Sequence, residues 1–292
     1  MKGEEHLWGV LNDKLDTLRA TNQMAEAIRV GQSALEIAKR SFGTADIRLA
    51  RSYEKLGLLH EQKGDRPGAK PYFVNAHRIL AGLEPADGQA VFYSSRRLGQ
   101  LCNELGHAEE AIDFYEQAVA AAPHVPELPF SDLGALLNNV ALICRKAGRA
   151  KTAEPYYVRA LEIYENQLGP DHPDVASVLN NLGVFYTNEK RFTEAEQIHL
   201  RALAIREKAF PSNHPDIAQS KCNLAVVYHS RGEYDRASEL YRASLQTWED
   251  AMAKPPEEYE VVAANYADLL RSLGKARKAQ ALESRVRKKR RG

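Results

Sequence analysis

The sequence contains little cysteine and no large excess of charge of either sign. Its 292 residues include three cysteines, and the formal net charge at pH 7 is +1. Cys102, Cys144 and Cys222 form no C-x-x-C pair, which argues against a disulfide framework and against a zinc site. We therefore expect all three to be buried as small apolar residues. The low net charge also argues against attraction of the whole protein to nucleic acid.

Long apolar segments are absent as well. No run approaches the roughly 18–20 apolar residues that cross a lipid bilayer, so the sequence predicts no membrane span. The segment from Met1 to His6 lacks the basic start and apolar core of a secretory signal peptide. On these grounds we expect a cytoplasmic protein.

Motifs of catalysis and metal binding are also missing. The sequence has no phosphate-binding loop, no dinucleotide fingerprint and no nucleophile elbow. Its nine histidines show no metal-ligand spacing. Two of them, His60 and His199, fall on interior positions of a repeating pattern, where we expect partly buried, hydrogen-bonded rings. The sequence therefore predicts no enzyme, no cofactor, no metal and no small-molecule substrate.

What the sequence does contain is an internal repeat with a period of 42 residues. Alanine recurs at this spacing at seven positions: Ala27, Ala69, Ala111, Ala153, Ala195, Ala237 and Ala279. Small residues recur 12 positions earlier in six of the seven repeats: Gly57, Gly99, Ala141, Gly183, Ala225 and Ala267. Small side chains at both positions allow two helices to approach closely, whereas a bulky side chain would overpack the contact.

A turn signal lies between the two series of small residues. It is glycine in five repeats, at Gly64, Gly106, Gly148, Gly232 and Gly274, and it is Asn22 or Lys190 in the other two. Glycine just past the end of a helix adopts the left-handed conformation that closes the helix. Each repeat is therefore expected to be a helix A, a short turn and a helix B.

The repeat also predicts the architecture. One helix pair cannot bury its apolar face alone, so neighbouring pairs stack. We expect an all-α fold, a right-handed superhelical α-solenoid of seven antiparallel helix pairs, with the A helices on its concave side. The expected segments are an amino-terminal lead over 1–7, a cap-like first repeat over 8–49, repeats over 50–91, 92–133, 134–175, 176–217 and 218–259, a carboxyl-terminal cap over 260–284 and a basic tail over 285–292.

The pattern of small and aromatic residues around each turn resembles the tetratricopeptide repeat, which is typically about 34 residues long. The additional residues here extend helix B and the loop after it. That loop contains His172-Pro173-Asp174 and His214-Pro215-Asp216, which are typical of helix starts. Together with Leu-Asn-Asn-Leu in the next helix A, these features resemble the kinesin light chain type of repeat. The resemblance is closest from about Leu136 to Leu245. The sequence lacks the heptad coiled coil of that family, so the resemblance implies a fold and a binding mode and not motor transport.

The resemblance also suggests ligand-facing positions. One of them, two residues before the small residue of helix A, is asparagine in four successive repeats: Asn139, Asn181, Asn223 and Asn265. An amide side chain both donates and accepts hydrogen bonds, so a row of amides can hold the backbone of an extended peptide. Kinesin light chain repeats hold cargo peptides with a similar row. In the alternative interpretation, the asparagines bond to neighbouring repeats and stiffen the stack.

The same face is basic in the first half of the chain. A ligand with carboxylates is expected there, although a solvated charged face is the open alternative. The predicted peptide-binding residues are Arg51, Lys55, Arg96, Arg97, Asn138, Asn139, Asn180, Asn181, Asn223 and Asn265.

These observations predict a monomeric, non-enzymatic scaffold that binds a peptide segment of a partner protein, acidic in character, in the concave groove. Two alternatives stay open. One is a structural or assembly role through the convex face or through end-to-end stacking, and the other is a regulatory peptide receptor. The basic tail favours a solvating cap over a contact with nucleic acid, an acidic protein or a membrane surface.

Overall fold

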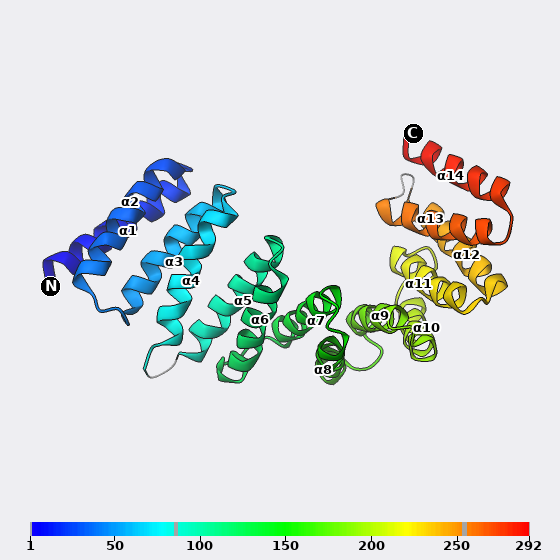
Figure 1. The fold of residues 1–292 in the computed structure, drawn as a ribbon, viewed down its shortest axis with the longest axis horizontal. Helices are drawn as coiled ribbons and strands as arrows, with labels where there is room; N and C mark the ends of the chain where they lie inside the picture. Colours follow the sequence, from blue (N-terminus) through cyan, green and yellow to red (C-terminus); the bar gives the residue numbers. More distant parts are fainter. Residues whose placement is uncertain (1, 85–86, 253–255, 292) are drawn as a thin grey trace. The chain divides into compact units, whose positions relative to one another are not determined.

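The computed structural model describes residues 2–84, 87–252 and 256–291. Within these ranges the regular structure is entirely helical, which confirms the predicted all-α class (Figure 1). The helices are α1 (Lys2–Ala20), α2 (Met24–Ser41), α3 (Ile47–Gln62), α4 (Arg66–Ala81), α5 (Gly88–Glu104), α6 (Ala108–Ala121), the short 3-10 helix η1 (Ala122–His124), α7 (Phe130–Lys146), α8 (Ala150–Leu168), α9 (Pro173–Asn188), α10 (Phe192–Ala209), α11 (Pro215–Arg231), α12 (Tyr234–Ala251), α13 (Glu257–Ser272) and α14 (Ala276–Arg291). Met1 of the predicted lead and Gly292 of the predicted tail lie outside the described residues.

The chain divides into two compact units, Met1–Gly148 and Arg149–Gly292. In the first unit α1 packs on α2, α3 on α4 and α5 on α6, and each even-numbered helix packs on the helix that follows it. The second unit repeats this arrangement with the pairs α9–α10, α11–α12 and α13–α14, and α8 packs on α9. Odd-numbered helices are the predicted A helices and even-numbered helices are the B helices. Each unit is thus a stack of helix pairs in which neighbouring pairs pack on each other.

The turns within the helix pairs have the predicted backbone conformation. Positive φ angles occur at all seven turn positions: Asn22, Gly64, Gly106, Gly148, Lys190, Gly232 and Gly274. Asn22 and Lys190 adopt φ 59° without being glycine. The turn therefore requires the left-handed backbone conformation even where the residue is not glycine. That conformation costs a non-glycine residue roughly 1–2 kcal/mol of conformational free energy.

Close helix contacts explain the two series of small residues. All seven alanines of the ladder are fully buried. A Cβ built on Gly99 would lie 2.6 Å from the Tyr115 ring, and one built on Gly183 would lie 2.6 Å from the His199 ring. The ring from helix B therefore occupies the space that a side chain on helix A would need. The three cysteines are buried, as predicted.

The histidines differ from the sequence prediction in one case. His172 and His214 begin α9 and α11 as predicted, and each imidazole accepts a hydrogen bond from the backbone N–H two residues later. His199 is only 1% exposed, and among the described residues neither ring nitrogen makes a hydrogen bond of ordinary geometry. Burial lowers its pKa to about 4, and the nearby backbone of Gly183 opposes this shift only in part. The prediction of a hydrogen-bonded ring is therefore wrong for His199, because the neighbouring glycine gives the ring room but no good partner.

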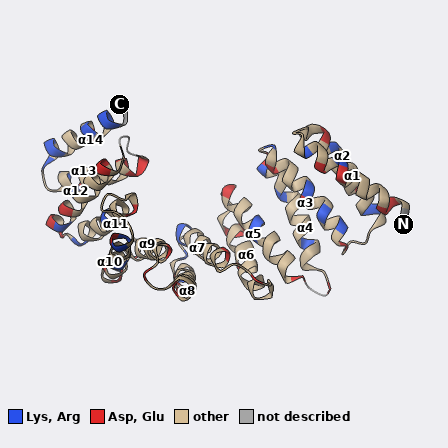
Figure 2. Ribbon diagram, turned by 180° about the vertical axis from the view of Figure 1, so that it is seen from behind, with Lys and Arg blue, Asp and Glu red and all other residues tan. Residues whose placement is uncertain are grey.

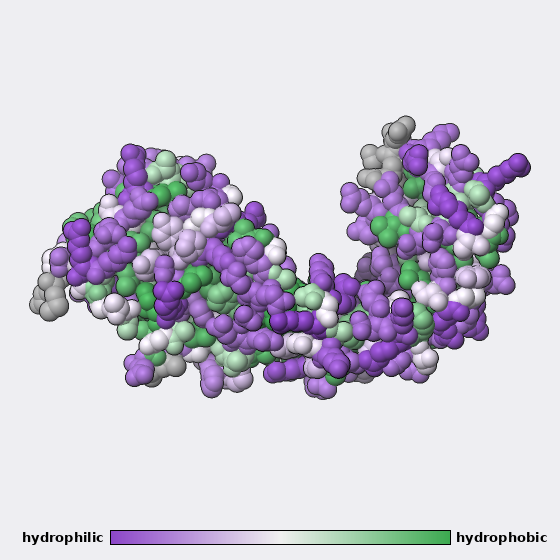
Figure 3. All heavy atoms as spheres, in the orientation of Figure 1, coloured by the Kyte–Doolittle hydropathy of each residue, from purple (hydrophilic) through white to green (hydrophobic). Residues whose placement is uncertain are grey.

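The surface of the described residues is mostly polar. Figure 3 shows that on the face seen in Figure 1 apolar side chains form small separate patches among polar ones. In the described part of the chain, no helix is both long and apolar enough to cross a lipid bilayer.

Tyr241 offers a test of how the core tolerates an unpaired polar group. It is fully buried, its ring stacks on that of Tyr266 at 5.7 Å, and its hydroxyl has no partner within the described ranges. An unsatisfied buried hydroxyl costs about 1–3 kcal/mol. We expect Tyr241→Phe to raise the free energy of unfolding by about 1 kcal/mol in urea denaturation.

Tyr228 is the matched control for this substitution. Its hydroxyl donates to Glu196 Oε1 at 2.7 Å, so Tyr228→Phe is expected to lower the free energy of unfolding by about 1 kcal/mol. Equal losses in the two variants would show that the Tyr241 hydroxyl has a stabilising partner after all.

Candidate functional site

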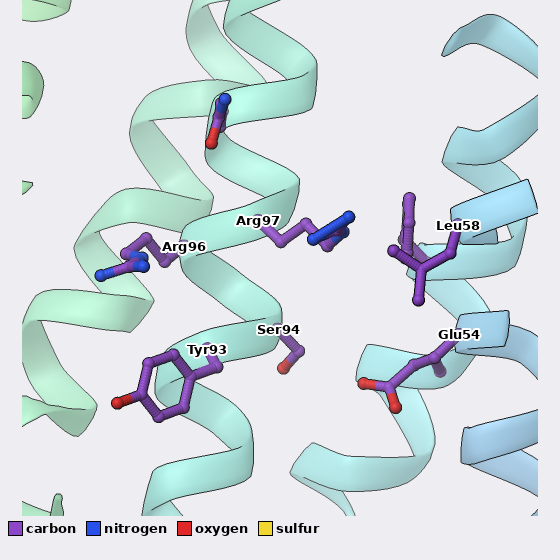
Figure 4. Close-up of a pocket in the computed structure, with 9 residues that line it drawn as sticks. Glu54, Leu58, Tyr93, Ser94, Arg96 and Arg97 are labelled. Atoms are coloured by element: carbon purple, nitrogen blue, oxygen red, sulfur yellow. The ribbon is translucent and has the colours of Figure 1, made fainter. Parts of the chain in front are cut away.

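A first pocket lies in the first unit between the A helices α3 and α5, and residues of α4 also line it. Its volume is about 300 Å³. Its lining residues are Glu54, Leu58, Phe73, Ala76, Tyr93, Ser94, Arg96, Arg97 and Gln100. Figure 4 shows Arg96 and Arg97 leaving α5 on opposite sides, with Arg97 directed toward Leu58. The pocket thus combines an apolar floor with polar and charged walls.

A second pocket adjoins the first on the other side of α5. It has a volume of about 480 Å³ and is lined by α5, α6 and α7. Its lining residues are Arg96, Gln100, Asn103, Glu104, Tyr115, Asp132, Ala135, Leu136, Asn139, Leu142, Ile143 and Lys146. Because Arg96 and Gln100 line both pockets, the two form one recessed surface along α3, α5 and α7. We call it the A-helix surface.

Two side chains set the character of the first pocket. Tyr93 is 40% exposed, which makes it one of the most exposed aromatic residues of the described chain. Burial raises the pKa of the Glu54 carboxyl, and the positive charge of Arg97 opposes that shift. The guanidinium of Arg97 lies 4.7 Å from the Phe73 ring centroid. The pocket therefore offers an aromatic wall, one partly desolvated carboxylate and a stacked arginine.

Comparison with known proteins identifies the repeat. Sequence models described as tetratricopeptide repeat match residues 132–186, 174–250 and 97–125. The chain contains tetratricopeptide repeats. A comparison with curated proteins gives no match.

Solved structures show the same fold. The crystal structure of BtubC (BKLC) from P. vanneervenii is 28% identical, with a TM-score of 0.57 over 78% of this chain and 90% of that one. A Rap protein complexed with competence and sporulation factor is 16% identical, with a TM-score of 0.56 over 97% of this chain and 76% of that one. A signal transduction ATPase with a tetratricopeptide repeat sensor, from Pyrococcus horikoshii, is 13% identical, with a TM-score of 0.63 over 95% of this chain and 41% of that one.

The predicted basic residues of the first tetratricopeptide repeats mostly pair with carboxylates of the protein itself. Lys55 Nζ lies 2.8 Å from Asp16, which is on α1. The other two pairs are Arg97 with Glu61 on α3, at 2.6 Å, and Arg96 with Asp132 on α7, at 3.2 Å. Each pair links successive A helices. These carboxylates neutralise part of the positive charge that the sequence predicts for this face, while Arg51 is exposed on α3.

The predicted asparagines are divided between the two units. Asn138 and Asn139 lie on α7, and Asn139 is exposed and lines the second pocket. In the second unit Asn223 Nδ2 donates to Asn180 Oδ1, and Asn223 Oδ1 accepts from Gln219 at 3.0 Å. Asn180 and Asn223 belong to neighbouring repeats, so this bond matches the alternative in which asparagines stiffen the stack.

The remaining two asparagines of the row, Asn181 and Asn265, are half-buried on α9 and α13. A hydrogen bond from Asn265 opposes the effect of burial, which raises the pKa of the Cys222 thiol to about 12. Part of the row therefore already serves contacts within the second unit.

Three predicted residues, Arg96, Arg97 and Asn139, line the A-helix surface. Three other side chains that line this surface, Glu54, Tyr93 and Gln100, were not predicted from the sequence. A signal for Glu54 existed, because it shares one repeat position with Arg96, Asn138 and Asn180, three residues before the small residue of helix A. Among the described residues no cluster of His, Cys, Asp and Glu could hold a metal ion.

Proposed function

We propose that this protein is a non-enzymatic scaffold that binds a peptide segment of a partner protein on the A-helix surface. The observation that carries the proposal is the pair of adjoining pockets that share Arg96 and Gln100 along three successive A helices. Recessed surfaces of a few hundred Å³ with an apolar floor and a few polar groups are typical of ligand sites. The Rap protein, whose structure has this fold, forms a complex with competence and sporulation factor, which supports a binding role for such a stack of helices.

The chemistry of the surface suggests how a peptide would be held. Leu58 and Phe73 form a floor for one apolar side chain, and the exposed Tyr93 can pack against it. The amides of Gln100 and Asn139 can donate to and accept from the peptide backbone. A carboxylate of the peptide would have to compete with Glu61 and Asp132 for the arginines. Such exposed ion pairs are worth only about 0–1 kcal/mol, so a peptide carboxylate can replace Glu61 or Asp132 at the arginines. We therefore expect the surface to favour acidic peptides.

The proposal extends to the predicted asparagines of the second unit and to the type of repeat. We propose that the 42-residue repeats are of the kinesin light chain type, which is supported by the period, by the helix starts at His172 and His214 and by the asparagine row. In this interpretation Asn223 exchanges its bond with Asn180 for a peptide backbone group. A cytoplasmic location fits the absence of a membrane-spanning helix among the described residues.

A random-decapeptide phage library panned on the wild-type protein tests the proposed surface. Selected peptides would be synthesised with fluorescein and titrated by fluorescence anisotropy. The double variant Gln100→Ala plus Asn139→Ala removes two exposed amides of the A-helix surface. We expect its affinity to fall about tenfold, because each lost hydrogen bond is worth about 0.5–1.5 kcal/mol.

The matched control is Gln32→Ala plus Gln62→Ala, which removes two exposed amides that line neither pocket. Its affinity should equal that of the wild type. Failure to select any peptide, or equal affinity for both double variants, would show that the A-helix surface is not a peptide site.

A further inference from the structure

A third recess lies in the second unit, between the B helices α12 and α14 and beside the A helix α13. Its volume is about 430 Å³. The residues that line it are Arg242, Leu245, Gln246, Tyr266, Leu270, Lys278, Ala281, Leu282 and Arg285. Most of them come from the two B helices, so this recess does not belong to the A-helix surface. We call it the cationic pocket.

The floor of the cationic pocket is aliphatic. Leu245, Leu270 and Leu282 are 2%, 6% and 9% exposed, and all three belong to the hydrophobic core of this unit. An apolar side chain entering the pocket would therefore contact core leucines directly. Removing such a side chain from water stabilises a complex.

The rim is cationic and largely uncompensated. Arg242, Lys278 and Arg285 surround the leucines, and none of the described residues that line the pocket is acidic. Within the described ranges, neither Arg242 nor Lys278 takes part in an ion pair, and Arg242 Nε donates only to the Ser238 carbonyl at 3.2 Å. The paired arginines of the A-helix surface differ in this respect.

The third cation of the rim shares one carboxylate with a neighbour. Glu249 lies 3.2 Å from Arg285 and 2.9 Å from Lys289, and it accepts a hydrogen bond from Tyr259. One negative charge thus faces two positive ones. Figure 2 shows that basic residues follow α14 along its length. The rim therefore retains a net positive charge.

We propose that the cationic pocket binds a protein segment that carries a large apolar side chain flanked by carboxylates. The apolar side chain fills the pocket over Leu245, Leu270 and Leu282, and the carboxylates pair with Arg242, Lys278 and Arg285. Arginine binds carboxylates with paired, charge-assisted hydrogen bonds, which fixes the orientation of the segment. A nucleic acid fits this site less well, because the lining offers one aromatic residue, Tyr266, and single-strand binding depends on several stacked aromatic rings.

A short fluorescein-labelled peptide with the core Glu-Glu-Leu-Phe-Glu-Glu tests the proposal in an anisotropy titration of the full chain. Lys278→Glu and Arg242→Glu should each weaken binding about tenfold or more, since each turns an attraction into a repulsion. Affinity should also fall as salt is added. Replacing Leu-Phe of the peptide by Ser-Ser, or its four Glu by Gln, should each weaken binding about tenfold.

The matched control is Arg277→Glu. Arg277 is exposed, adjoins Lys278 on α14 and does not line the pocket. This variant should bind the peptide almost as well as the wild type, and circular dichroism should show all three variants equally helical. Equal weakening by Arg277→Glu and Lys278→Glu would overturn the proposal, because it would indicate diffuse attraction to a basic helix.

Two competitors distinguish other ligands. The competitors are phosphatidylserine vesicles and a single-stranded oligonucleotide. If either binds with higher affinity than the peptide and loses affinity equally on Lys278→Glu, the ligand of the cationic pocket is not a protein segment. In the Gln100→Ala plus Asn139→Ala background, the tenfold loss of peptide affinity on Lys278→Glu should persist, so failure here and failure of the A-helix surface are separate results.

Discussion

Replacing Gly99 with valine is expected to lower the free energy of unfolding by about 3 kcal/mol. A Cβ on Gly99 would lie 2.6–2.8 Å from three ring carbons of Tyr115. The Tyr115 side chain is only 4% exposed, so it cannot move into solvent without opening the contact between α5 and α6. Valine adds two methyl groups beyond that Cβ. The loss would appear as a lower midpoint in urea denaturation monitored by circular dichroism.

Gly9 provides the matched control for the same substitution. It lies within α1, and a Cβ built there would meet no atom within 4 Å. Gly9→Val is therefore expected to change the free energy of unfolding by no more than about 0.5 kcal/mol, since valine is somewhat better than glycine in a helix. Replacing the opposing ring by a smaller side chain with Tyr115→Leu should recover part of the stability lost in Gly99→Val. Similar losses for Gly99→Val and Gly9→Val would mean that the close approach of α5 and α6 does not select glycine.

The helix pairs could be predicted in detail because the repeat encodes them several times over. Alanine at Ala153 is ambiguous alone, but the same residue at seven equally spaced positions indicates a buried contact, and all seven are fully buried. The turn prediction extended even to Asn22 and Lys190, whose φ angles are positive although neither is glycine. Stacking neighbours impose one backbone conformation at each equivalent position, so local propensity matters less than register.

The candidate site was less accessible to the same reasoning. The sequence indicates which face of helix A carries Arg96, Arg97 and Asn139, and these residues do line the pockets. It does not indicate which rotamer a long side chain adopts. Arg97 reaches back to Glu61 on the preceding A helix, so a charge predicted for the ligand is partly used within the protein.

The cationic pocket escaped prediction for a related reason. Arg242 and Lys278 lie on different B helices, and only the packing of α13 against both α12 and α14 brings them around the same leucines. From the sequence, the basic end of the chain was interpreted as a solvating cap, because a run of basic residues shows charge but not the aliphatic floor beside it. Sites assembled from side chains of separate repeats need the packing as well as the period.

Acid is expected to destabilise the second unit through His199. Burial lowers the pKa of this imidazole from 6.5 to about 4 in the folded protein. Between these values the unfolded chain binds a proton that the folded chain excludes, so stability falls as the pH drops from about 6.5 to about 4. The full shift corresponds to roughly 3 kcal/mol. Above pH 7 the His199 imidazole is neutral in both the folded and the unfolded protein, so it contributes no pH dependence to the stability.

His199→Phe should remove this dependence. Phenylalanine already fills the equivalent position at Phe73, which lies against Gly57 as His199 lies against Gly183. Urea denaturation of both proteins at pH 7, 6, 5 and 4 isolates the effect, because carboxylates with lowered pKa values, such as Asp65 and Glu194, destabilise both proteins equally in acid. The difference between variant and wild type should grow by roughly 3 kcal/mol from pH 7 to pH 4. A constant difference would mean that the imidazole is protonated inside the folded protein, and that the ring is not excluded from water as its burial indicates.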